Sequence, residues 1–169
     1  MLILTDNDVI GAVRVFRRIL ESPAWVDMTA TLALQFIELK DVELPADAPD
    51  VAVWRRSQEV GALLITGNRS SGEGSLDQTI AEQAGPASLP VLTIGDPRRV
   101  IRDPVYAREC ALSLLDFVER IETLRGTGRL LASIMASATP FCFCTTQKHL
   151  SVKIVIISMG YAMISPIPP

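Results

Sequence analysis

The chain has 169 residues and a formal net charge of −3, and 49% of its residues are hydrophobic, which suits one domain with a buried core. Without a basic excess, the composition argues against tight nonspecific binding to long nucleic-acid duplexes. It does not exclude a nuclease, because a metal-dependent nuclease needs carboxylates and only a local basic surface. The 3 cysteines are a poor disulfide framework, and the N-terminus lacks the basic start of a signal peptide, so we expect a cytoplasmic protein.

Charge divides the chain near residue 130. All 19 acidic residues lie before Leu131, whereas only two lysines among the 16 basic residues follow it. This pattern predicts an α/β domain over residues 1–130 and a low-charge apolar tail over residues 131–169, outside the core fold. Three interpretations of the tail stay open: a poorly ordered appendage, a membrane anchor, or a segment translated past a former stop codon or in a shifted frame. Its longest apolar run, residues 154–167, is shorter than the roughly 20 residues of a membrane helix, so we expect no membrane association.

Short apolar runs alternate with amphipathic segments along the body of the domain. In chain order we expect a strand over 2–5, a helix over 8–21, a strand over 34–39, a helix over 47–60, a strand over 62–66, a helix over 76–84, a strand over 90–94 and a helix over 104–124. Helix starts are indicated by Ser75 with Gln78 three residues on, and by Asp103 before a proline. Apolar strands that alternate with helices are typical of parallel sheets. The sequence therefore predicts an α/β three-layer sandwich with a four-stranded, mainly parallel sheet and helices on both faces.

Polar side chains follow every predicted strand, at the edge where ligands bind in open parallel sheets. These residues are Asp6, Asn7 and Asp8 after the first strand, Asp47 and Asp50 after the second, Thr66, Asn68 and Arg69 after the third, and Asp96, Arg98 and Arg99 after the fourth. Carboxylate oxygens bind Mg²⁺, and such ions clamp a phosphodiester and generate the attacking hydroxide. An ordinary role as a helix cap or turn residue stays open for Asp8, Asp50 and Asp96.

The loop after the third predicted strand, residues 67–74, contains three glycines. Glycines let backbone amides approach an anion, and Arg69 is placed to hold a phosphate. The loop is not a phosphate-binding P-loop, because it lacks the Gly-Lys-Ser/Thr ending and does not follow the first strand. The same composition also describes a mobile surface loop, and that alternative stays open.

Three segments, LILTDND, DAPDVAVW and LLITGNR, resemble the motifs of small bacterial PIN-like proteins over roughly the first hundred residues. The resemblance implies a PIN-like fold and a Mg²⁺- or Mn²⁺-dependent ribonuclease of the toxin type, with RNA as substrate and a small antitoxin-like protein as partner. Asp6 matches the first metal-binding acid of the family and Asp50 the second. Asn68 stands where the family has its third acid, and a neutral amide there weakens metal binding.

From the motifs and the sheet edge together we expect Asp6, Asp50 and Asp96 as catalytic residues and Arg69 as a phosphate ligand. The expected metal ligands are Asp6, Asp8, Asp50, Asn68 and Asp96. A degenerate, non-catalytic domain that binds a protein partner or a second copy of itself is the main alternative. A phosphoacceptor receiver domain needs a lysine after its last strand, whereas the only lysine of the body is Lys40. Acyl transfer needs a Gly-x-Ser-x-Gly elbow and a histidine, and the only histidine, His149, lies in the tail.

Overall fold

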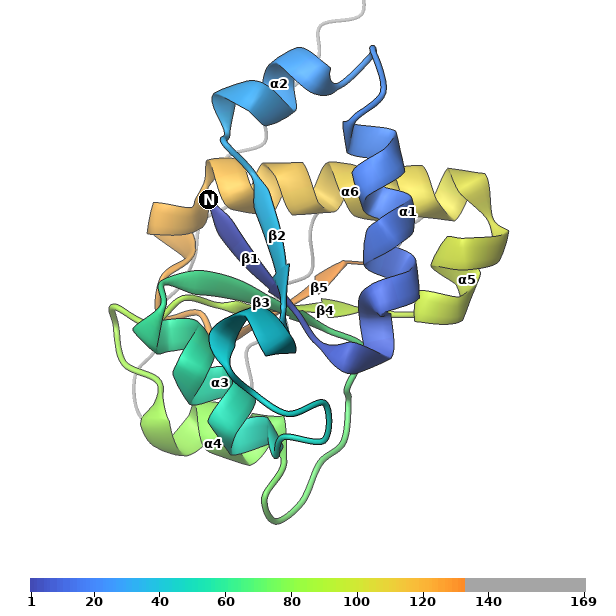
Figure 1. Ribbon diagram of the computed structural model, residues 1–169. Coiled ribbons are helices and arrows are strands. Elements are labelled where there is room, and N and C mark those ends of the chain that lie inside the picture. The colour runs from blue at the N-terminus through green and yellow to red at the C-terminus, as the bar shows by residue number, and fades with distance from the viewer. Residues whose placement is uncertain (133–169) are drawn as a thin grey trace, which may run out of the picture.

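A computed structural model describes residues 1–132, which form one α/β unit (Figure 1). The strands are β1 (Leu2–Thr5), β2 (Gln35–Glu38), β3 (Ala62–Thr66), β4 (Val91–Ile94) and β5 (Arg129–Ala132). The α-helices are α1 (Ile10–Leu20), α2 (Val26–Thr31), α3 (Asp50–Glu59), α4 (Leu76–Gln83), α5 (Pro97–Arg102) and α6 (Pro104–Glu119). Short 3₁₀ helices are η1 (Asn7–Val9), η2 (Leu39–Val42) and η3 (Ile121–Leu124). None of these helices is long and apolar enough to cross a membrane. The tail beyond Ala132, with its three open interpretations, lies outside the described residues.

All five strands pair in parallel, in the order β2-β1-β3-β4-β5. The parallel sheet and the four strands placed from sequence are confirmed, but the prediction of only four strands is wrong. The fifth strand, β5, pairs along its length with β4, and the predicted domain boundary at residue 130 falls inside it. Sequence reasoning missed β5 because the loss of charge near residue 130 suggested that the fold had ended before this strand was complete.

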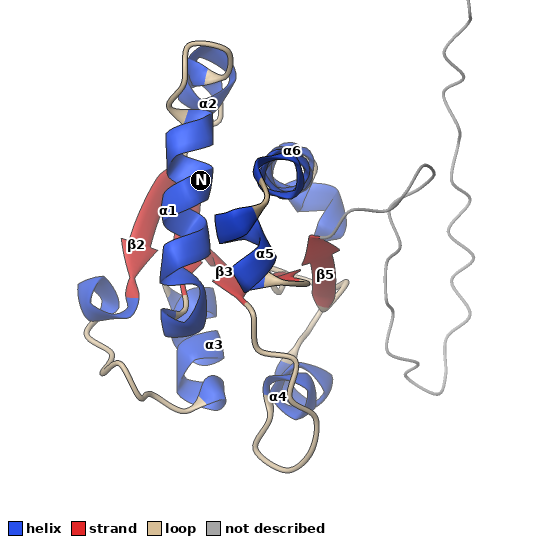
Figure 2. Ribbon diagram, turned by 90° about the vertical axis from the view of Figure 1, so that its right-hand side faces the viewer, coloured by secondary structure: helices blue, strands red, loops and turns tan. Residues whose placement is uncertain are grey.

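Alternating strand residues face two separate cores, one on each face of the sheet. One core gathers Ile3, Leu63 and Leu92 with the apolar sides of α1 and α6. The other gathers Leu4 and Leu64 with the apolar sides of α3 and α4. Figure 2 shows the sheet between these two groups of helices. Strands buried on both faces have continuous apolar sequences, which is why the central strands were recognisable from sequence.

The connection from β4 to β5 differs from the others in its hand. The chain moves in one direction along the sheet from β3 to β4 and on to β5. Helix α4 packs on one face, whereas α6 packs against α1 on the opposite face. The two crossovers therefore have opposite hands, although about 98% of parallel crossovers are right-handed. As a consequence, α5 lies beside α1 rather than beside α4.

Two short helices, α2 and α5, were absent from the sequence prediction. Helix α5 is capped by Asp96, whose side chain accepts a hydrogen bond from the Arg99 N–H at 2.9 Å, and Pro97 is at the first helical position. Acid-then-proline is a recognised start of a helix, but the sequence analysis left a cap or turn role open for Asp96 and expected no helix between residues 94 and 104. At α4 the predicted Ser75 cap is confirmed, because its side chain accepts a hydrogen bond from the Gln78 N–H.

Candidate functional site

The adjacent ends of β1 and β3 form the switch point of the sheet. After β1 the chain enters α1 on one face, and after β3 it enters α4 on the other face. Ligands of open parallel sheets bind in the crevice at such a point, beyond the carboxyl ends of the strands. Thr66 is the last residue of β3 there, Gly67 and Asn68 follow it, and each of the three contacts a different predicted site acid.

Thr66 holds Asp6. The buried Thr66 hydroxyl donates a 2.8 Å hydrogen bond to Asp6 Oδ2, and the Asn7 N–H donates one of 2.8 Å to Asp6 Oδ1. The Thr66 hydroxyl oxygen in turn accepts a 2.9 Å hydrogen bond from the Asn68 N–H. The orientation of the Asp6 carboxylate is thus set from both strand ends, and each of its oxygens keeps capacity for another donor or a cation.

Gly67 lies against Asp8. The Gly67 N–H donates to both carboxylate oxygens of Asp8, at 3.3 and 3.1 Å. A Cβ at residue 67 would lie 2.7 Å from Pro97 Cγ and 3.0 Å from Asp8 Oδ2, so only glycine fits without displacing its neighbours. Partial burial, followed by the negative charge of Asp6, raises the pKa of Asp8 above its ordinary value despite the Gly67 hydrogen bond.

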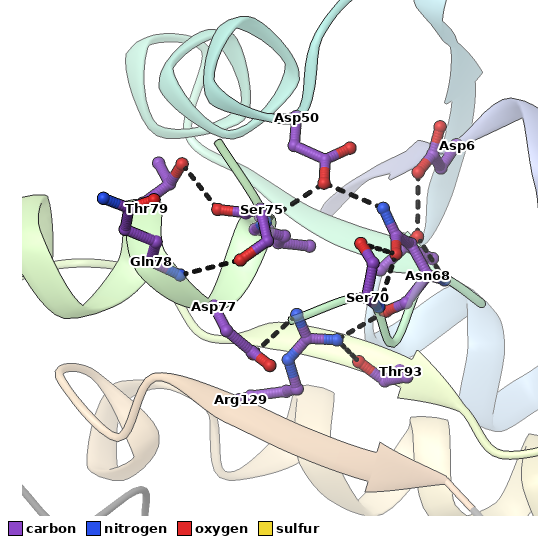
Figure 3. A network of polar contacts seen from close by, with 12 residues as sticks. Asp6, Asp50, Asn68, Ser70, Ser75, Asp77, Gln78, Thr79, Thr93 and Arg129 are labelled. Carbon is purple, nitrogen blue, oxygen red and sulfur yellow. Dashed lines mark hydrogen bonds and ion pairs between the residues drawn. The ribbon is translucent and has the colours of Figure 1, made fainter. Parts of the chain in front are cut away.

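Asn68 contacts Asp50 through its amide nitrogen. Asn68 Nδ2 donates a 2.8 Å hydrogen bond to Asp50 Oδ2, which also accepts one of 3.0 Å from the Leu76 N–H (Figure 3). Asn68 Oδ1 accepts hydrogen bonds from the Ser70 N–H at 2.8 Å and the Ser70 hydroxyl at 2.6 Å. These partners fix which end of the amide faces Asp50. The side-chain oxygen expected to bind a metal ion therefore faces Ser70, and a donor N–H₂ group faces the acid.

Arg129, which the sequence analysis did not select, fastens this loop to the sheet. Its Nη1 donates to the Asn68 carbonyl oxygen at 2.6 Å and to Thr93 Oγ1 at 2.9 Å, and its Nη2 lies 2.8 Å from Asp77 Oδ1 (Figure 3). The Arg129 side chain is only 15% exposed, so the position of the loop depends on β5. Recognising this residue required the fifth strand, which lay across the predicted boundary.

Asp96 and Arg69 occupy the β4 side of the edge. The Asp96 carboxylate caps α5 through the Arg99 N–H, and no hydrogen bond among residues 1–132 links it to Asp6, Asp8 or Asp50. Arg69 is exposed, and its Nη1 donates to the Gly95 carbonyl oxygen at 3.3 Å. Arg69 thus spans the ends of β3 and β4, where a phosphate can reach it from solvent.

The predicted site acids would suit a metal site with few protein ligands better than a site with many. Within residues 1–132, no three His, Cys, Asp or Glu side chains form a group able to hold a metal ion. The five expected ligands are therefore not gathered around one point by carboxylates alone. Mg²⁺ is commonly held by one or two protein carboxylates together with waters and substrate phosphates. Asp6 and Asp50, which lie on either side of Asn68 in Figure 3, are the two carboxylates that such a site would use.

Comparison of the chain with protein-family models, with curated proteins and with solved structures gives no match. The receiver alternative gains no support, because Lys40 lies after β2 in η2, 2.8 Å from Glu38. An acyl-transfer site gains none either, since no histidine falls within residues 1–132.

Proposed function

We propose that the protein is a PIN-like domain that binds one divalent cation, Mg²⁺ or Mn²⁺, through Asp6 and Asp50, and that its ligand is an RNA phosphodiester. The observation behind the proposal is that Thr66 and Asn68, two residues apart at the end of β3, hydrogen-bond to Asp6 and Asp50 from two other segments. Neither acid serves only the helix that it begins. Both are instead oriented towards the switch point, where a ligand would bind.

When bound, the cation would supply charge to neutralise a phosphodiester and to lower the pKa of bound water. The residues of the chain have separate roles in this proposal. Asp6 and Asp50 hold the cation, Thr66 orients Asp6, and Asp8 adds negative charge beside it. Arg69, exposed across the β3 and β4 ends, binds a phosphate oxygen by a charge-assisted hydrogen bond.

Asn68 makes this a weakened form of such a site. An acid at residue 68 would add charge and oxygen ligands, whereas the amide N–H₂ already provides Asp50 with a donor in place of a cation. That observation favours the second candidate, a non-catalytic binding domain with the same fold. The two candidates differ in one respect: only the first requires Asp6 and Asp50 to bind metal.

Titration calorimetry of the full chain with Mn²⁺ and Mg²⁺ tests the proposal. We expect binding with a Kd below about 1 mM, weakened at least about tenfold in Asp6→Asn and Asp50→Asn, which keep side-chain size but remove the charge. Asp96→Asn is the matched control, because that carboxylate caps α5, and its binding should equal that of the wild type. Absence of binding to the wild type at millimolar metal would retire the metal site and leave the non-catalytic candidate.

Cleavage of an end-labelled single-stranded RNA in Mn²⁺ separates the two candidates further. The enzyme hypothesis predicts cleavage that disappears in Asp6→Asn. Metal binding without any cleavage would show that the site has kept the cation and lost the reaction.

A further inference from the structure

A second surface feature lies away from the metal site, between α1 and the α5–α6 corner. It is a groove of about 660 Å³, which we call the α1–α5 groove. Its apolar lining residues include Val15, Ile19, Trp25, Val100, Ile101 and Pro104. Figure 2 shows the helices that form it on one side of the sheet. Ile101 lines the groove and is 58% exposed, so its apolar surface lacks a covering partner among residues 1–132.

Two of the helices that line the groove, α1 and α5, are basic in a protein with a net negative charge. Helix α1 contains three arginines and no acid, and the same is true of α5. Ion pairs within the described residues engage Arg17 with Glu21, at 3.6 Å, and Arg99 with Asp103, at 3.1 Å. Arg18 and Arg108, which line the groove itself, are both exposed and take part in no ion pair among residues 1–132. Two cations thus flank an open apolar surface.

We infer that the α1–α5 groove is a docking site for an acidic amphipathic helix of a protein partner. The apolar stripe of such a helix would cover Ile101 and its neighbours, and carboxylates beside that stripe would face Arg18 and Arg108. A second copy of this chain bound through the same face is disfavoured, since a two-fold contact would bring two copies of the same positively charged surface together without supplying carboxylates. RNA is disfavoured because its phosphates are bound by hydrogen-bond donors, whereas most of the residues that line the groove are apolar. The inference is independent of the metal site.

Fluorescence anisotropy on the full chain tests the inference with designed peptides. The probe is a labelled helical peptide of about 18 residues, or five turns, with leucine on one face and glutamate on both flanks of that face. Two matched peptides have lysine in place of glutamate, or the same composition in scrambled order. We expect the glutamate peptide to bind with a Kd of about 1–100 μM and the other two at least about tenfold more weakly.

Two variants localise the contact. Ile101→Glu should weaken binding of the glutamate peptide at least about tenfold, and the double substitution Arg18→Glu with Arg108→Glu should invert the preference in favour of the lysine peptide. Val105→Glu is the matched control, because Val105 is 67% exposed but does not line the groove, and it should bind like the wild type. Far-UV circular dichroism of each variant checks that it is folded.

Four outcomes would overturn the inference. Equal binding of the glutamate and lysine peptides would remove the role of the arginines. A glutamate peptide that binds Ile101→Glu as tightly as the wild type would place the site elsewhere. Sedimentation showing a wild-type dimer that Ile101→Glu dissociates would assign the groove to a second copy of the chain, and competition by single-stranded RNA alone would assign it to nucleic acid.

Discussion

Acids at the starts of helices differ in their hydrogen-bond partners and pKa values between two parts of the sheet edge, the end of β4 and the adjacent ends of β1 and β3. On the β4 side, Asp103 caps α6 by accepting hydrogen bonds from the Val105 and Tyr106 N–H groups at 3.0 and 3.1 Å. The Tyr106 N–H is the main cause of its lowered pKa, and Arg99 adds to it. On the β1–β3 side, Asp8 accepts from Gly67, 59 residues away in sequence, and its pKa is raised.

The difference separates a cap from a candidate ligand. A cap bonds to residues two or three positions on, so its role ends with its own helix. Asp6, which also accepts from the Asn7 N–H, bonds to Thr66, and Asp8 and Asp50 bond to Gly67 and Asn68, so three segments meet at one strand end. Substitutions at Asn68, Gly67, Asp8 and Asp96 test this difference between the two sides.

Asn68→Asp should have the largest effect. It removes the donor to Asp50 Oδ2, which now lies 2.8 Å from Asn68 Nδ2, and brings two carboxylates together. Without metal we expect the free energy of unfolding to fall by about 2–3 kcal/mol, the size of a hydrogen bond to a charged group. Excess Mg²⁺ should restore much of this loss, because a cation that binds only the folded state stabilises it. Urea unfolding with and without Mg²⁺ measures both effects.

Asn68→Ala is the control for that experiment. It removes the same hydrogen bond without adding a charge, so it should be destabilised with no recovery in Mg²⁺. If Mg²⁺ also failed to restore the unfolding free energy of Asn68→Asp, Asp6 and Asp50 would be structural residues like Asp103. The acids at the β1–β3 ends would then not differ from the helix caps at the β4 end.

Gly67→Ala should be next in size. The added Cβ would lie 2.7 Å from Pro97 Cγ and 3.1 Å from Val9 Cγ1, a contact that forces neighbouring atoms to move. Overpacking of this kind costs about 1–3 kcal/mol, measured as a shift of the urea midpoint. Gly85→Ala is the matched control, because nothing lies within 4 Å of its added Cβ, and it should unfold like the wild type.

Gly67 also shows how far the sequence could predict this molecule. The strand before it was predictable, because β3 is buried at every residue and such a strand is continuously apolar. That Gly67 packs against Pro97 was not, because the contact depends on α5 lying beside α1. The position of α5 follows from a crossover of the less common hand, for which a single sequence contains no periodic pattern.

The acids of the site were predictable by position but not by orientation. Parallel strands place their carboxyl ends at one edge, so Asp6, Asp50 and Asn68 were expected near each other. Which end of the Asn68 amide faces Asp50 depends on Ser70 and on the loop that Arg129 holds. Those partners come from segments without a sequence motif, and Arg129 lies in the strand that was missed.

Asp8→Asn should have a smaller effect, with a defined dependence on pH. The pKa of Asp8 in the folded protein is raised above 3.8, its ordinary value. At pH values between 3.8 and the folded pKa, the folded state therefore binds more protons than the unfolded state. The unfolding free energy therefore falls as pH rises through that window. Asparagine keeps an acceptor for the Gly67 N–H and removes the charge beside Asp6, so we expect a gain of less than about 1 kcal/mol near neutral pH.

The Asp8→Asn gain should shrink as pH falls from the raised folded pKa towards 3.8, and it should be lost below 3.8, where the wild-type carboxyl is protonated in both states. Asp103→Asn should show the opposite sign, because a lowered pKa stabilises the fold at neutral pH and that contribution is lost as pH falls through the folded value. Urea unfolding over a pH series compares the two variants. A pH dependence of the same sign in both would contradict the proposed difference between the two sides.

Asp96→Asn should have the smallest effect of the four. Asparagine is as good a helix cap as aspartate, so it should still accept the Arg99 N–H, and stability should stay within about 0.5 kcal/mol of the wild type. Asp96→Ala, which removes the acceptor, should cost about 1 kcal/mol. That pair of results would identify Asp96 as a cap whose charge is dispensable. A marked loss of Mn²⁺ binding in Asp96→Asn would instead extend the metal site across the end of β4 and remove the boundary between the two sides.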